Sequence, residues 1–80
     1  MTTTWSSEEE NFLQVAFAAV PRITEIIVAF PAEHRAGALE AAERRYTEAA
    51  QDFGCTEVAA CTCVSDVMRD LRTQVETVVA

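Results

Sequence analysis

Apolar residues recur every three or four positions along most of the chain, which is the spacing of an amphipathic helix and not of a strand. A serine at Ser6 or Ser7 precedes a glutamate by three residues, and this capping box predicts a helix that begins near Ser7. The apolar stripe that follows consists of Phe12, Leu13, Val15, Ala16, Phe17, Ala19 and Val20. Pro21 lacks a backbone donor, so a kink or short break is predicted near residues 19–21, before the helix resumes up to residue 29.

A second helix is predicted from Pro31, whose backbone angle suits the first helical position, to residue 53, because Gly54 suits the left-handed residue after a helix end. Its apolar residues are spaced alternately by three and four and predict one buried seam, made of Leu39, Ala42, Tyr46, Ala49 and Phe53. Glu40 and Arg44 on the other side are four residues apart and predict an ion pair on a solvated face.

A third helix is predicted after Thr56, a residue type that caps helix starts. Its heptad-like seam consists of Cys61, Val64, Met68, Leu71, Val75 and Val78. The segments 7–29, 31–53 and 57–79 are equal in length, at about 35 Å each. Equal rods with short connections favour an all-α antiparallel bundle of three long helices, the first broken near Pro21.

The domain boundaries follow from the same pattern. Residues 7–80 are predicted to form a single helical domain and residues 1–6 a flexible tail, in which Trp5 packs on the first helical turn. An alternative topology is a two-helix hairpin from residues 31–79 that dimerises into a four-helix bundle.

Five consecutive apolar residues, from Ile26 to Phe30, surround the first predicted helix completely. One face of a helix is too narrow to bury all of them, and a chain of 80 residues offers few ways to enclose such a segment. We therefore predict a homodimer whose interface contains Ile26, Ile27, Val28 and Phe30. The alternative is that Val28 and Ala29 are exposed singly, which is common on protein surfaces.

The charge is strongly unbalanced, with 13 acidic residues against six basic ones and a formal net charge of −7. Nucleic acid binding depends on several clustered cations, so direct contact with nucleic acid is not expected. An acidic surface suits docking onto a basic protein, and Glu8, Glu9 and Glu10 cluster at the start of the first helix. A second possibility is an acidic decoy that occupies a nucleic-acid-binding surface of another protein.

Three cysteines, Cys55, Cys61 and Cys63, leave at least one thiol unpaired in the monomer, which argues against a secreted disulfide scaffold. The N-terminus also lacks the basic and apolar regions of a signal peptide, and the apolar stretch up to Phe30 is interrupted by Pro21 and charged residues. We therefore expect a cytoplasmic protein without a membrane span.

The cysteines are also the candidate ligands and nucleophiles. Cys61 and Cys63 point to different sides of a helix, which argues against a shared metal ion. Cys55 precedes a helix start, where the dipole lowers a thiol pKa, so a reactive redox thiol at Cys55 remains an alternative. The acidic neighbours Asp52 and Glu57 would oppose that shift.

No glycine-rich phosphate loop, nucleophile elbow or two-histidine motif occurs, and His34 is the only histidine. We therefore expect neither an enzyme nor a bound cofactor or metal. Abundant alanine, with arginine in place of lysine, is typical of GC-rich bacterial genomes. The prediction for function is a small acidic helical protein–protein interaction module, a bacterial adaptor or regulator that acts as a homodimer.

Overall fold

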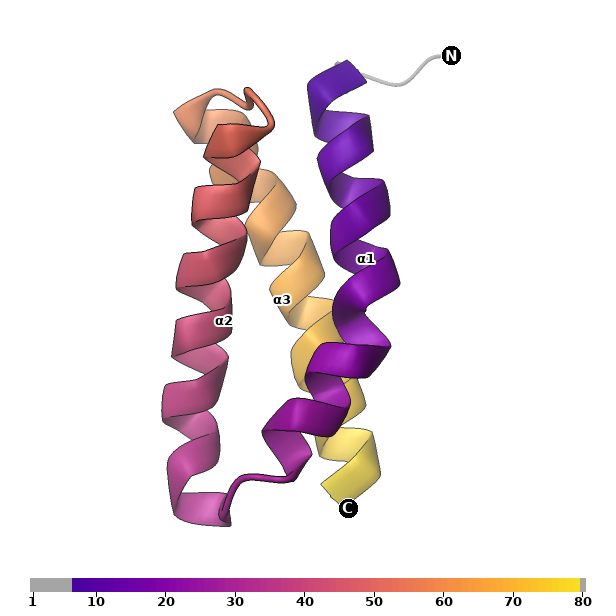
Figure 1. Ribbon diagram of the computed structural model, residues 1–80, viewed down its shortest axis with the longest axis vertical. Coiled ribbons are helices and arrows are strands. Elements are labelled where there is room, and N and C mark those ends of the chain that lie inside the picture. Colours follow the sequence, from indigo (N-terminus) through magenta and orange to yellow (C-terminus); the bar gives the residue numbers. More distant parts are fainter. Residues whose placement is uncertain (1–6, 80) are drawn as a thin grey trace.

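The chain folds into an antiparallel bundle of three helices. The computed structural model describes residues 7–79, and over that range it contains α1 (Ser7–Val28), α2 (Ala32–Asp52), α3 (Glu57–Val79) and no strand. Figure 1 shows α1 descending, α2 ascending and α3 descending behind the gap between them. The predicted all-α three-helix bundle is confirmed, and because α1 packs against both other helices, the two-helix hairpin is not the fold of the chain. The predicted tail at residues 1–6, with Trp5, lies outside the described residues.

Pro21 lies inside α1, which continues through it to Val28, so the predicted break is absent. The α1 ribbon changes direction in its lower half and turns toward the start of α2 (Figure 1). A proline removes one backbone hydrogen bond, but the buried residues on either side of it, Val20 and Thr24, hold both halves of α1 against the core. Of the predicted kink or short break, the structure therefore shows a change of direction within one continuous helix, which tertiary packing holds together.

The end of α2 follows the predicted glycine signal. Gly54 has φ of 94°, and its N–H donates to the carbonyl of Gln51 at 3.0 Å, while the N–H of Cys55 donates to the carbonyl of Ala50 at 3.1 Å. These two bonds form a Schellman motif. At the other end Pro31 precedes the helix as its N-cap instead of occupying its first position, because its ψ of 152° is extended.

Thr56 caps α3 as predicted, since its Oγ1 accepts a hydrogen bond from the backbone N–H of Ala59 at 3.1 Å. The buried face of α3 is wider than the predicted seam and comprises Ala60, Cys63, Val64, Val67, Met68, Leu71 and Val75. The prediction was wrong at both ends of the seam, because Cys61 and Val78 are exposed. A helix that packs against two others buries two adjacent strips, and the second strip here includes Cys63 and Val67.

The α2 seam is confirmed, with Tyr46 buried and the other four residues packed partly against the core. Phe12 of α1 meets the rings of Tyr46 and Phe53 edge-on, at centroid distances of 6.3 and 5.8 Å. The predicted ion pair of Arg44 is not formed within residues 7–79. Instead Glu43 pairs with Arg72 of α3 at 3.4 Å, which joins two helices.

Candidate interaction site

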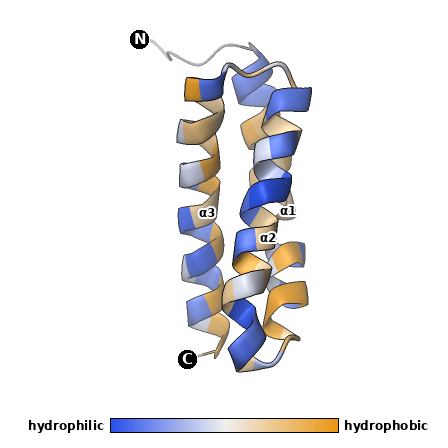
Figure 2. Cartoon of the chain, turned by 90° about the vertical axis from the view of Figure 1, so that its left-hand side faces the viewer, coloured by the Kyte–Doolittle hydropathy of each residue, from blue (hydrophilic) through white to orange (hydrophobic). Residues whose placement is uncertain are grey.

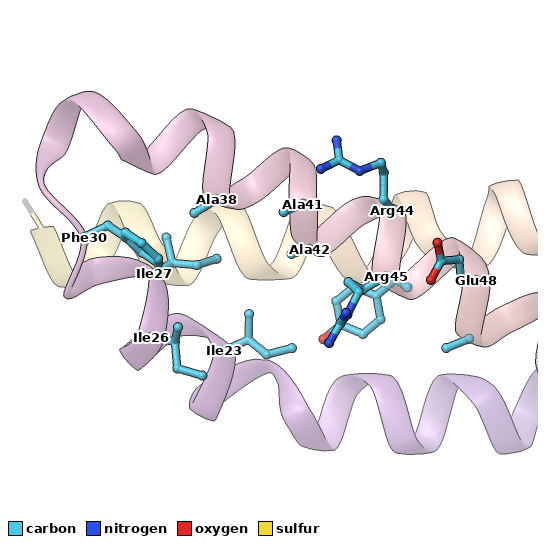
Figure 3. A pocket seen from close by; sticks show the side chains of 12 residues that line it. Ile23, Ile26, Ile27, Phe30, Ala38, Ala41, Ala42, Arg44, Arg45 and Glu48 are labelled. Carbon is cyan, nitrogen blue, oxygen red and sulfur yellow. The ribbon is translucent and has the colours of Figure 1, made fainter.

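A groove of about 820 Å³ lies between the second half of α1 and residues 38–49 of α2. One wall is made of large side chains from α1 and from the turn that follows it, which are Ile23, Ile26, Ile27 and Phe30. The α2 wall is made mainly of alanines, Ala38, Ala41, Ala42 and Ala49. Figure 3 shows the two walls on opposite sides of the gap, with α3 behind it. We call this feature the α1–α2 groove.

The groove exists because the α2 wall is too small to fill it. An alanine side chain ends at Cβ, so opposite Ile23 and Ile27 no α2 side chain reaches across the gap. Tyr46 is the larger of the two buried side chains of α2, and its hydroxyl donates to the backbone carbonyl of Ala16 at 3.1 Å. That bond holds α2 to the middle of α1, and beyond it the two helices leave the groove open.

Charged residues occur only on the α2 side of the groove lining, at Arg44, Arg45 and Glu48. Arg44 points away from α1, whereas Arg45 points toward it (Figure 3). The lining therefore combines an apolar interior with a polar rim on one edge. This arrangement resembles the grooves that receive one face of an amphipathic helix.

The four predicted interface residues differ in their exposure to solvent. Ile27 is buried at 2% exposure and Val28 is partly buried against the core, whereas Ile26 is 54% exposed and Phe30 is 44% exposed. Figure 2 shows the last turns of α1 as hydrophobic. Packing within the chain therefore covers half of the apolar segment, and Ile26 and Phe30 remain at the groove without cover.

Sequence reasoning missed the α2 wall of the groove. Ala38 and Ala42 recur at helical spacing and lie on the same side of α2 as Ala41 and Ala49. Such a small-residue face is visible in the sequence, but alanine is also the commonest filler of helix surfaces. Only its position opposite Ile23 makes it one wall of a groove.

Beyond Gln14, the side of α1 that faces solvent is also mostly apolar. Exposed residues are spaced alternately by three and four along it, and we call this strip the outer face of α1. It consists of Val15, Ala18, Arg22 and Glu25, with Ala29 in the turn that follows the helix. Arg22 and Glu25 are the only charged residues between positions 11 and 32. Neither has an ion-pair partner within the described chain.

Carboxylates gather where α1 begins, α2 ends and α3 begins. The two segments that meet at this end, residues 7–15 and 48–60, contain no arginine. Their carboxylates are Glu8, Glu9, Glu10, Glu48, Asp52 and Glu57, and we call this region the acidic end. Glu8 and Glu10 are exposed, whereas Glu9 is partly buried.

The acidic end changes the chemistry of the cysteines. Burial raises the pKa of Cys55, and the carboxylates of Glu9 and Glu8 raise it further. Burial also raises the pKa of Cys63 to about 11, with smaller contributions from Cys55 and Glu9. A pKa lowered by the helix dipole was the basis of the alternative reading of Cys55 as a reactive thiol. The structure gives the opposite direction, first because the thiol is partly buried and second because two α1 carboxylates lie beside the loop.

Metal-binding geometry is not present in the described part of the chain. Among residues 7–79, no three His, Cys, Asp or Glu side chains are arranged to hold one ion. His34, in the first turn of α2, is exposed.

Helix α1 is also, among the described helices, the one long and apolar enough to cross a membrane. Over Ser7–Val28 it contains an 18-residue window of mean hydropathy 1.3, of which 28% is buried in the bundle. Core helices of soluble proteins and signal sequences share these properties, so length and composition alone do not identify a span.

No protein-family model, curated protein or solved structure was found to match this chain. Its function is therefore inferred from its own surfaces, which are the α1–α2 groove, the outer face of α1 and the acidic end.

Proposed function

We propose that the chain is a small helical protein–protein interaction module that acts as a homodimer, in the role of a bacterial adaptor or regulator. The observation that carries this proposal is the α1–α2 groove, with Ile26 more than half exposed and Phe30 beside it. Fully burying an exposed isoleucine or phenylalanine side chain contributes roughly 1.5–3 kcal/mol. Ile26 and Phe30 are 54% and 44% exposed, so about half of that gain remains for a second chain that covers them.

The lining of the groove favours a protein partner over a small substrate. Sites for small molecules place several polar groups so that they converge on the ligand, but the charged residues here occupy one edge of the groove. Within that lining there is no histidine, cysteine or serine that could act as a nucleophile or base. An apolar floor with a charged rim is the composition of an interface.

Sedimentation velocity of the wild type and of Ile26→Glu tests the proposal. Ile26 is exposed, so a charge there is compatible with the fold but is buried in the dimer, and the variant should be monomeric where the wild type is a dimer. Ile26→Glu is a sharper test than a change at Val28, which packs against the core of its own chain.

The matched control is Val58→Glu, which introduces the same charge at an aliphatic residue of α3 that is 79% exposed and lies outside the groove. This variant should dimerise like the wild type. A wild-type protein that stays monomeric up to about 500 µM, a concentration at which even weak dimers are populated, would refute the proposal.

The acidic end supports a second role, which is docking onto a basic protein. Residues 7–15 and 48–60 carry six carboxylates and no arginine, so the side chains of these two segments carry a net negative charge. An acidic decoy for a nucleic-acid-binding protein is one form of the same role. Glu8 and Glu10 are the residues to test, since both are exposed, whereas Glu9 is partly buried beside the cysteines.

A fluorescent deca-arginine peptide serves as the probe for this second role. Binding should weaken about tenfold or more when salt rises from about 50 to 500 mM, and Glu8→Lys/Glu10→Lys should weaken it at low salt. The control, Glu33→Lys/Glu76→Lys, makes the same change in net charge on α2 and α3, away from the acidic end. Equal weakening by both double variants would show that only net charge matters and would refute a defined docking surface.

A further inference from the structure

The outer face of α1 has the spacing of a helix–helix contact. Its five residues follow one another at intervals of three, four, three and four, which is the a and d pattern of a coiled coil, and all of them are exposed. Ala18 and Ala29 are small, so a second helix can approach α1 closely at these two positions. Ile26 borders the same face on the side of the groove.

The two charges on this face are complementary to each other. Arg22 and Glu25 have opposite signs, have no ion-pair partner within the described chain and are flanked by apolar residues in both directions. In a two-fold symmetric contact the same patch meets itself, so a residue of one copy contacts a different residue of the other, and the contact occurs twice. A patch with one arginine and one glutamate is therefore self-complementary in one orientation.

We propose that the outer face of α1 packs antiparallel against the same face of a second copy, so that Arg22 of each chain lies opposite Glu25 of the other. This inference rests on the proposed homodimer and adds the helix, the orientation and the register of its interface. In this register Ala18 of one copy lies opposite Ala29 of the other, and Ile26 lies at the edge of the contact, between the outer face of α1 and the groove.

Other arrangements of the same two faces are electrostatically worse. In a parallel contact Arg22 would face Arg22 and Glu25 would face Glu25, and like charges across an interface are unfavourable. In the antiparallel contact shifted by one helical repeat, Arg22 would face Ala18 and Glu25 would face Val15. Each charge would then lose water without gaining a partner.

Charge reversal tests the register. Arg22→Glu alone gives two acidic residues on each face, and Glu25→Arg alone gives two basic residues, so each variant replaces two attractive contacts by two repulsive ones. The dissociation constant of each homodimer should rise roughly tenfold or more. An equimolar mixture of the two variants should form a heterodimer about as tight as the wild type, and Arg22→Glu/Glu25→Arg should restore the homodimer.

The controls separate this inference from the proposed homodimer. Arg69→Glu makes the same reversal in an exposed Asp66–Arg69 pair of α3, which has the same three-residue spacing, and it should leave the dissociation constant unchanged. Circular dichroism of every variant checks that helix content is retained. If the wild type dimerises but the mixture is no tighter than the single variants, the register is wrong while the homodimer stands. If the wild type is monomeric, both proposals fail.

Discussion

At the scale of single residues, polar groups in the core affect the stability of this protein through the hydrogen bonds that they make or lack. Tyr46 satisfies its hydroxyl on the backbone carbonyl of Ala16, whereas the Oγ1 of Thr24 is buried with no hydrogen-bond partner. Arg35 donates from its Nη2 to the carbonyl of Val28 at 3.2 Å and so caps the end of α1 with a cation. The unsatisfied hydroxyl of Thr24 lowers the free energy of unfolding, whereas the hydrogen bonds of Tyr46 and Arg35 stabilise the bundle.

Replacing Thr24 by valine should increase the free energy of unfolding by about 1 kcal/mol, because the substitution keeps the shape and removes the unpaired hydroxyl. Urea denaturation of both proteins measures the difference. The control is Thr62→Val in α3, where the exposed hydroxyl donates to the carbonyl of Val58, and no gain is expected there. A loss of stability in Thr24→Val would show that the hydroxyl finds a partner in solution.

Cys63 should make the protein less stable at high pH. Its pKa rises from 9.0 to about 11 on folding, chiefly through burial. Above pH 9.0 the unfolded thiol ionises while the folded thiol keeps its proton, so its contribution to stability is fully present below pH 9.0 and is lost as the pH approaches about 11. Urea midpoints measured across this range should fall less steeply in Cys63→Ala than in the wild type.

Cys61 provides the control for the buried thiol, because it lies two residues away and is exposed. At neutral pH, Cys63→Ser should cost about 1–3 kcal/mol through burial of a hydroxyl, whereas Cys61→Ser should cost almost nothing. Equal pH profiles for wild type and Cys63→Ala would remove Cys63 as the source of the alkaline loss.

At the scale of the helix, local signals at the ends decide where each element begins and stops. The Schellman motif at Gly54 and the side-chain cap at Thr56 lie two residues apart, so α2 and α3 are joined by a short, hydrogen-bonded turn. The connection after α1 is different, because Pro31 offers no side-chain cap and Arg35 instead holds the end of α1.

The two glycines should respond oppositely to alanine. Gly54→Ala should lower the free energy of unfolding by about 1 kcal/mol or more, because a φ of 94° is unfavourable for an L side chain and the new Cβ would lie 3.4 Å from Cγ of Glu8. Gly37 lies within α2, and beyond its own helical turn no described residue lies within 4 Å of an added Cβ, so Gly37→Ala should raise the free energy of unfolding by about 0.5–1 kcal/mol. Thermal unfolding followed by circular dichroism measures both changes. If both variants were stabilised or both destabilised, the opposite roles of the two glycines would be contradicted.

At the scale of the whole molecule, three helices make a long, flat body with extents of 40 × 24 × 16 Å. With α3 behind the gap, α1 and α2 share the front of the bundle (Figure 1), and no further helix of residues 7–79 covers them. Small domains bury a limited share of their surface, which makes association a direct route to further stability. The exposed apolar residues of α1 are the surface that association would cover.

If the proposed homodimer contributes to stability, the melting temperature should depend on protein concentration. Binding that occurs only in the folded state stabilises by mass action, so the melting temperature of the wild type should rise by roughly 5 °C or more over a hundredfold increase in concentration. Ile26→Glu should melt at a temperature that does not change with concentration. Differential scanning calorimetry across this range gives both results, and a constant wild-type value would contradict a stabilising dimer.

The sequence by itself determined the three helices, their boundaries to within one residue and the buried seam of α2, because Pro31, Gly54 and Thr56 act on their immediate neighbours through backbone angles and hydrogen bonds. It also indicated the run from Ile26 to Phe30 as an apolar segment without enough cover, since an apolar run around a helix is visible without knowing its neighbours.

Only the tertiary structure decided the features that depend on residues far apart in the chain. It kept α1 continuous through Pro21, turned Cys63 instead of Cys61 into the core and raised the pKa of Cys55, first through burial and then through Glu9. The α1–α2 groove likewise needs the large side chains of one helix to face the alanines of another. Each of these features depends on the distance between two helices and on their rotation relative to each other. The periodicity of residues within one helix determines neither.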